Sequence, residues 1–185
     1  MISLSALQPA DILLSTGSAA ASVVIRGATV SRYSHAALYL GDGQIVEAIG
    51  HGVTLQGVRD AMSDDTLVSV YRRLQMSLQQ GQQVVRYARR QVGKDYDYAG
   101  AMGGGITSPS GFVIGVFLSP IVLVGGIAAD LHNRANPEAS FYCSELVALA
   151  FENAGVPLGS GAASTTPADI SRSHVLNYVG DLKKS

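Results

Sequence analysis

Alternating apolar and polar residues predict an antiparallel sheet built from short strands. Alternation with a period of two is typical of a strand that buries one face. A turn that enters a short strand is expected at 9–14, and further strands are expected at 34–41, 44–49, 53–60, 67–73 and 175–182. Residues 18–30 are small and apolar, and their spacing is weakly helical.

Apolar residues at helical spacing predict two longer helices. The first covers 82–91, and Gly93 ends it; the second covers 141–153, with Ser140 as its expected cap and Gly155 behind it. A short third helix near 170 is expected, because Thr166 is a good capping residue and Pro167 suits the first helical position.

One stretch departs from this pattern, because no charged residue lies between Asp97 and Asp130. We expect a single domain over 1–185 that carries an apolar, glycine-rich insertion at about 99–130. Residues 111–129 approach the roughly 20 apolar residues that span a bilayer, although Pro120 disfavours one plain spanning helix. Two interpretations stay open: a buried hairpin of helices, or an acyl-chain groove or membrane contact that includes Phe112 and Phe117 as substrate-binding residues.

The hairpin at 34–49 carries a histidine and a glutamate that can meet on one face. A three-residue loop at 41–43 would pair Leu40 with Gln44 and Ala37 with Glu47, which makes His35 and Glu47 diagonal neighbours roughly 6–8 Å apart. A two-residue turn would instead pair residue 38 with Glu47 and place Glu47 on the opposite face. A carboxylate that accepts one ring N–H leaves the other ring nitrogen free to take a proton.

Cys143 is the only cysteine of the chain and lies at the start of the second predicted helix. Free backbone N–H groups and the helix dipole at such a position favour a thiolate and can stabilise an oxyanion. A thiol, an imidazole and a carboxylate together form a nucleophile with its base and its orienting group. The alternative is a buried and inert cysteine, which is the commoner state of a lone cysteine.

Composition narrows the class of protein. The 185 residues are 47% hydrophobic and only 15% charged, which excludes a disordered chain. The net charge of −1 gives no reason to expect a nucleic-acid partner. The first residues lack a basic region and a long apolar run, so we expect no Sec signal, and either a cytoplasmic location or export by a signal-independent route.

Two separated segments resemble one enzyme family. They read Ser-His-Ala-Ala-Leu-Tyr-Leu-Gly-Asp-Gly at 34–43, followed by Val-Glu-Ala at 46–48, and Tyr-Cys-Ser-Glu-Leu-Val at 142–147. The chain resembles the circularly permuted NlpC/P60 group, papain-like thiol hydrolases of the YaeF/YiiX kind that are related to lecithin:retinol acyltransferases. Supporting matches are Pro-Ala-Asp-Ile at 9–12, where Ala10 replaces the usual glycine, Gly-Lys-Asp-Tyr-Asp at 93–97, and Thr-Pro-Ala-Asp-Ile at 166–170.

The resemblance implies an α+β, permuted papain-like fold in which an antiparallel sheet packs on the helix that carries the cysteine. It implies Cys143 as nucleophile, His35 as base and Glu47 as the third polar residue. Attack of a thiolate on an ester or amide would form an acyl-enzyme, which passes to water or to another acceptor. This reaction needs no cofactor, and His51, His132 and His174 lack the spacing of metal ligands.

The apolar insertion favours a membrane lipid as the substrate, as in a phospholipase or acyltransferase. Two alternatives remain: a peptidoglycan amidase or endopeptidase, and a non-catalytic module that inserts 111–129 into a membrane. A toxin delivered into a neighbouring cell would explain the missing signal, and such an effector would imply an immunity protein as partner.

Other residues have less specific interpretations. Tyr39 shares the predicted His35 face and either lines the site or packs, and Tyr142 is a second substrate-binding candidate. His51 is the fallback partner for His35 if Glu47 is on the wrong face. Asp11 is expected to anchor a turn, with support of the site as the alternative. The arginines at positions 72, 73, 86, 89 and 90 are expected on solvated faces, where they could also touch lipid head groups.

Overall fold

The computed structural model describes residues 1–16, 31–63, 65, 67–96, 140–159 and 161–183. The expectations for 18–30, for the insertion at 99–130 with its segment 111–129, and for Phe112, Phe117 and His132 lie outside these residues.

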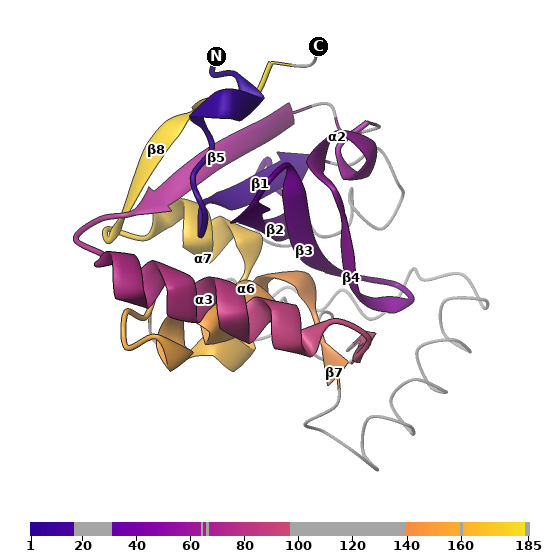
Figure 1. Ribbon diagram of the computed structural model, residues 1–185, viewed down its shortest axis with the longest axis vertical. Helices are drawn as coiled ribbons and strands as arrows, with labels where there is room; N and C mark the ends of the chain where they lie inside the picture. Colours follow the sequence, from indigo (N-terminus) through magenta and orange to yellow (C-terminus); the bar gives the residue numbers. More distant parts are fainter. Residues whose placement is uncertain (17–30, 64, 66, 97–139, 160, 184–185) are drawn as a thin grey trace.

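The sheet has six antiparallel strands in the order β4-β3-β2-β1-β5-β8. Their bounds are β1 Ile12–Thr16, β2 His35–Gly41, β3 Gln44–Ile49, β4 Gly52–Gly57, β5 Leu67–Arg73 and β8 Leu176–Asp181. The helices α3 (Leu78–Gln91), α6 (Cys143–Asn153) and α7 (Pro167–Arg172) lie together on one side of the strands (Figure 1). The predicted antiparallel sheet packed on a helix that begins at the cysteine is therefore confirmed.

Smaller elements complete the described part. They are the 3-10 helices η1 (Leu4–Ala6) and η3 (Ala162–Ser164), the short helix α2 (Val58–Ala61), and two short strands, β6 (Asp95–Tyr96) and β7 (Ser140–Phe141). The pair β6-β7 is parallel. The two chain ends approach each other, because Ile2 bridges to Leu182 beside β8 (Figure 1).

Several predicted boundaries differ from the structure, and three of the differences have a clear local cause. The strand expected at 53–60 ends at Gly57, because the N–H of Val58 bonds to the carbonyl of Gly43 and the chain turns into α2. Helix α3 begins at Leu78, four residues before the predicted first residue, 82. Ser77 and Gln80 form a capping box at this start. Helix α6 begins at residue 143, so Ser140 belongs to β7 and is not the cap of α6.

The β2–β3 hairpin combines features of both predicted turns. Ala37 pairs with Glu47, which confirms the register that places His35 and Glu47 on one face. The predicted pairing of Leu40 with Gln44 is wrong, because Gly41 pairs with Gln44 and a bulge lies between residues 39 and 41. The connection is a two-residue turn, at positions 42 and 43, whose φ angles of 52° and 72° are both left-handed. The bulge absorbs one residue and so restores the register that a two-residue turn alone would lose.

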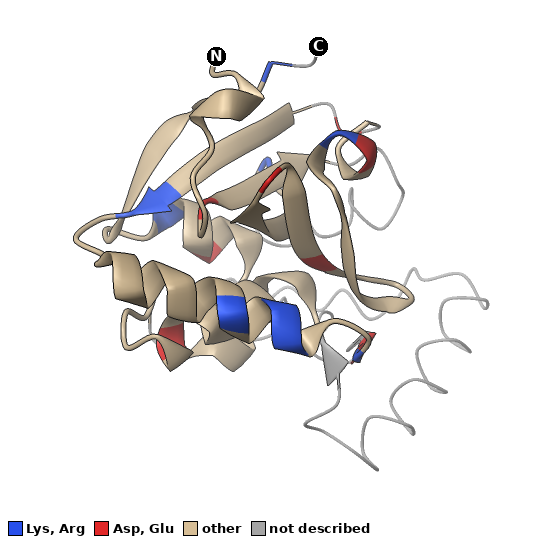
Figure 2. Cartoon of the chain, viewed as in Figure 1, with Lys and Arg blue, Asp and Glu red and all other residues tan. Residues whose placement is uncertain are grey.

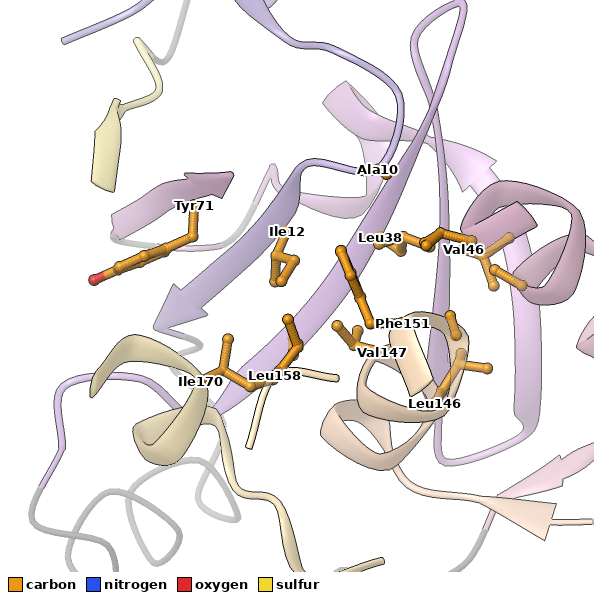
Figure 3. Packing of buried hydrophobic residues seen from close by; sticks show 14 of the residues in the cluster. Ala10, Ile12, Leu38, Val46, Tyr71, Leu146, Val147, Phe151, Leu158 and Ile170 are labelled. Atoms are coloured by element: carbon orange, nitrogen blue, oxygen red, sulfur yellow. The ribbon is translucent and has the colours of Figure 1, made fainter. Parts of the chain in front are cut away.

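The main core lies between the sheet and the helices. Phe151 and Val147 of α6 point toward Ile12 of β1 and Leu38 of β2 (Figure 3). Phe151 is fully buried and is among the largest such side chains. Burying an aromatic side chain of this size stabilises a fold by about 2–3 kcal/mol. This packing fixes α6, and with it the cysteine at the first helical position, against the strand that begins with His35.

Candidate functional site

Three adjacent strands place polar side chains on one face of the sheet. His35 begins β2, Glu47 is in the middle of β3, and Gln56 lies on β4. Glu47 pairs in register with Ala37 on one side and with Thr54 on the other. Because the side chains of alternate residues share a face, His35 and Gln56 are both diagonal neighbours of Glu47.

The carboxylate of Glu47 joins these residues through hydrogen bonds. His35 Nε2 lies 2.6 Å from Glu47 Oε2, and Gln56 Nε2 donates to Glu47 Oε1. The Glu47 side chain is only 5% exposed, whereas that of His35 is 22% exposed. A charge-assisted bond this short and this well shielded from water is stronger than a bond between neutral groups. It fixes the plane of the imidazole and occupies Nε2, which leaves Nδ1 as the ring nitrogen for a second partner.

That second partner is Cys143, the first residue of α6. Cys143 is 6% exposed and is a free cysteine. The cap of α6 is Tyr142, whose backbone N–H lies 3.5 Å from Oε2 of Glu145 in the first turn. Backbone N–H groups of the first helical turn have no partner within a helix, so they are available to a negative charge at this end.

The charge states of the two groups support each other. Burial favours neutral His35, but the charge and hydrogen bond of Cys143, and then those of Glu47, outweigh it and raise the pKa of His35 well above its ordinary value. Burial likewise favours the neutral thiol, but the charge and hydrogen bond of His35, followed by the N–H groups of Ala36 and Ser144, outweigh it and lower the pKa of Cys143. Both shifts favour a thiolate beside an imidazolium.

Sequence reasoning missed Gln56, which it treated only as part of a strand. The signal was present, because the turn at Gly50-His51 pairs Ile49 with Gly52 and thereby sets Thr54 opposite Glu47. Gln56 is then two residues further along the same face. A second missed residue is Ser15 of β1, which pairs in register with His35. Among the buried side-chain polar groups of the described residues, its hydroxyl is the one without a hydrogen-bond partner.

The other predicted residues lie in different surroundings. The hydroxyl of Tyr39 accepts the N–H of Gly43 at 3.0 Å in the hairpin turn, which is the packing role that the sequence left open. The hydroxyl of Tyr142 donates to the carbonyl of Ala163 at 2.7 Å, so it ties the start of α6 to η3. His51 is exposed in the β3–β4 turn, and Glu47 partners His35 in its place.

Asp11 anchors a turn, as predicted, by accepting the N–H of Gln8 at 2.8 Å. Arg72 departs from its predicted solvated position. Its Nε and Nη2 each lie 2.7 Å from an oxygen of the buried Asp11 carboxylate, which raises the pKa of Arg72 through those hydrogen bonds, against the effect of burial. Other basic residues of the described part are spread over several elements (Figure 2).

Two broader properties can be stated for the described part of the chain. Its residues contain no cluster of three or more histidine, cysteine or acidic side chains that could hold a metal ion. None of the helices in those same ranges has the length and apolar character required to cross a membrane.

Comparison with known proteins places the chain in a family. Residues 6–102 match the family described as permuted papain-like amidase enzymes, YaeF/YiiX, C92. The chain is 30% identical to the "Probable lipoprotein peptidase YaeF" of Escherichia coli K12, over 96% of this chain and 71% of that protein. The crystal structure of the metalloprotein YiiX from Escherichia coli O157:H7 is similar with a TM-score of 0.64 and 19% identity, over 94% of this chain and 96% of that one. The chain therefore belongs to the permuted papain-like amidases of the YaeF/YiiX type, and it shares their fold.

Proposed function

We propose that this chain hydrolyses an amide bond by nucleophilic catalysis, with Cys143 as nucleophile, His35 as proton carrier and Glu47 as the group that orients His35. The observation that supports the proposal most strongly is the position of the imidazole between a carboxylate and a thiol, with both pKa shifts favouring the ion pair. Membership of an amidase family supports the choice of an amide over other acyl bonds.

In the proposed reaction the thiolate of Cys143 attacks the carbonyl carbon and forms a tetrahedral intermediate. Backbone N–H groups at the start of α6 stabilise the negative charge on its oxygen. The imidazolium of His35 gives a proton to the leaving amine as the carbon–nitrogen bond breaks, which leaves a thioester on Cys143. His35 then takes a proton from water, and the hydroxyl that forms cleaves the thioester to release the acid and the thiol.

A peptide, with or without a lipid attached, is the natural first substrate to test, because the YaeF relative is named a peptidase. A lipid ester is the second candidate, because the apolar sequence at 111–129 favours an acyl chain near the site. Peptidoglycan fragments offer a third set of amide bonds. The expected effector role and its immunity protein stay predictions, as does a membrane contact through 111–129.

The test compares the wild-type chain with Cys143→Ala and Cys143→Ser on three substrate sets: lipopeptides, peptidoglycan fragments and phospholipid vesicles. Amide hydrolysis releases new amino groups, ester hydrolysis releases fatty acid, and both transiently add the acyl mass to Cys143. We expect new amino groups and an acyl adduct with the wild type only. Fatty acid release from the vesicles, with no new amino groups, would replace the amide with the lipid ester.

Two further results would end the proposal. Hydrolysis that persists in Cys143→Ala would exclude a thiol mechanism. A protein that permeabilises vesicles equally well with and without the thiol, and cleaves none of the three substrates, would be the non-catalytic membrane module.

A further inference from the structure

Glu47 uses both oxygens of its carboxylate, and the second one meets a residue with no role in the proposed reaction. Oε2 lies against His35 Nε2 at 2.6 Å, while Oε1 accepts a hydrogen bond from Nε2 of Gln56. A carboxylate can only accept such bonds, so the amide of Gln56 must turn its NH2 group toward Glu47. The carboxylate is thus held between two donors on the two neighbouring strands.

The position of Gln56 is itself fixed by the sheet. The β3–β4 ladder runs without a shift from Ile49–Gly52 to Gln44–Gly57, which sets the register of Gln56 against Glu47. The other N–H of its amide faces the hydroxyl of Thr54 at 3.5 Å. Gln56 is half-buried, so its amide is partly shielded from water that would compete for Glu47.

We propose that Gln56 is a positioning residue that holds the Glu47 carboxylate in the orientation in which it bonds to His35. An uncharged amide suits this task, because it orients the carboxylate and leaves the negative charge to act on the imidazole. A lysine or arginine at this position would compete with the imidazolium for the same charge. This inference rests on the proposed function and names one more residue of that same site.

The polar groups around the imidazole come from four elements. Cys143 of α6 and Glu47 of β3 are the titratable ones, and both favour the imidazolium. Gln56 and Thr54 of β4 and Ser15 of β1 lie on the same face and are uncharged. Without Gln56, the carboxylate has one fixed oxygen in place of two and can rotate away from His35. The imidazolium then loses support, and so does the thiolate.

The experiment measures the rate at which iodoacetamide alkylates Cys143 as a function of pH, which requires no substrate. Gln56→Ala is compared with the wild type, with His35→Ala, and with Leu55→Ala, a control on the same strand whose side chain points to the opposite face. We expect the inflection of the profile to move to higher pH in Gln56→Ala and to stay unchanged in Leu55→Ala. On a cleaved substrate, kcat/KM of Gln56→Ala should fall by about 10–100-fold, because small displacements of a catalytic group cost this much.

A second variant keeps the size of the side chain. In Gln56→Glu, the new carboxylic acid can donate to Glu47 only while it is protonated, so alkylation and activity relative to the wild type should be highest at acidic pH and fall as the new acid ionises. A profile that equals the wild type in both variants, while His35→Ala shifts it, would refute a positioning role for Gln56 and leave the proposed function intact. If hydrolysis survives Cys143→Ala, the proposed function itself fails.

Discussion

Removing the guanidinium of Arg72 should destabilise this fold by about 2–3 kcal/mol. Asp11 is 1% exposed and meets Arg72 through two bonds of 2.7 Å. Breaking a buried ion pair by deleting one partner costs about 3–5 kcal/mol, because a charge stays buried without compensation. The expected loss lies just below that range, since the Arg72 side chain is 30% exposed and Asp11 still accepts the N–H of Gln8.

The assay is urea unfolding at pH 7, followed by circular dichroism, for Arg72→Met, Asp11→Asn and the double variant. The double-mutant cycle should give a coupling energy above about 1 kcal/mol, because the two side chains contact each other directly. The double variant should lose less stability than the sum of the two single variants, because it leaves no lone buried charge. The reasoning is refuted if Arg72→Met costs under about 0.5 kcal/mol, the usual limit for an exposed surface residue, or if the two single changes simply add.

Three other changes test separate parts of the structure. Phe151→Ala should cost about 3–5 kcal/mol in a urea titration, because this fully buried ring anchors α6, and a loss below about 1 kcal/mol would contradict the described core. Gly52→Ala should lower the melting temperature, because a Cβ there would lie 2.5 Å from the Lys94 carbonyl oxygen and the φ of +115° disfavours a side chain; an unchanged melting temperature would refute this. The wild-type alkylation profile of Cys143 should have its inflection below the ordinary thiol value and rise with pH through it, because the thiolate is the reactive form and the pKa of Cys143 is lowered. His35→Ala should move that inflection upward, since burial of the thiol remains while the opposing charge is gone, and a fixed inflection would show that His35 does not act on the thiol.

Local patterns were sufficient for the parts of the fold that depend on neighbours in sequence. Helix α7 begins after the Thr166-Pro167 cap, as predicted. The capping box of Ser77 and Gln80, which starts α3 earlier than predicted, is a pattern that can also be recognised in the sequence alone. The hairpin shows the limit of such rules. Its Gly-Asp-Gly segment fits two turn types, and only the combination of a turn with a bulge at Leu40 gives the observed pairing.

Contacts between distant segments could not be predicted without the strand order. Arg72 meets Asp11 because β5 and β1 are neighbours in the sheet, and nothing local to either residue indicates this. The encounter of Cys143 with His35 came from resemblance to a family, since more than a hundred residues separate them. Gln56 was within reach of sequence reasoning, which stopped at the first hairpin and did not extend the register to β4.

The parallel pair β6–β7 has a consequence for how this protein can be engineered and how its relatives can diverge. Asp95 pairs with Ser140, and Tyr96 with Phe141, immediately before the cap of α6. The N–H of Val53 on β4 bonds to Lys94 at the entry of this pair. The two residues before the segment 97–139 and the two residues after it are therefore held together by the same strand pair. Exchanging that segment for one of another length or composition should leave the proposed nucleophile in place, because the β6–β7 pair stays between the exchanged segment and α6.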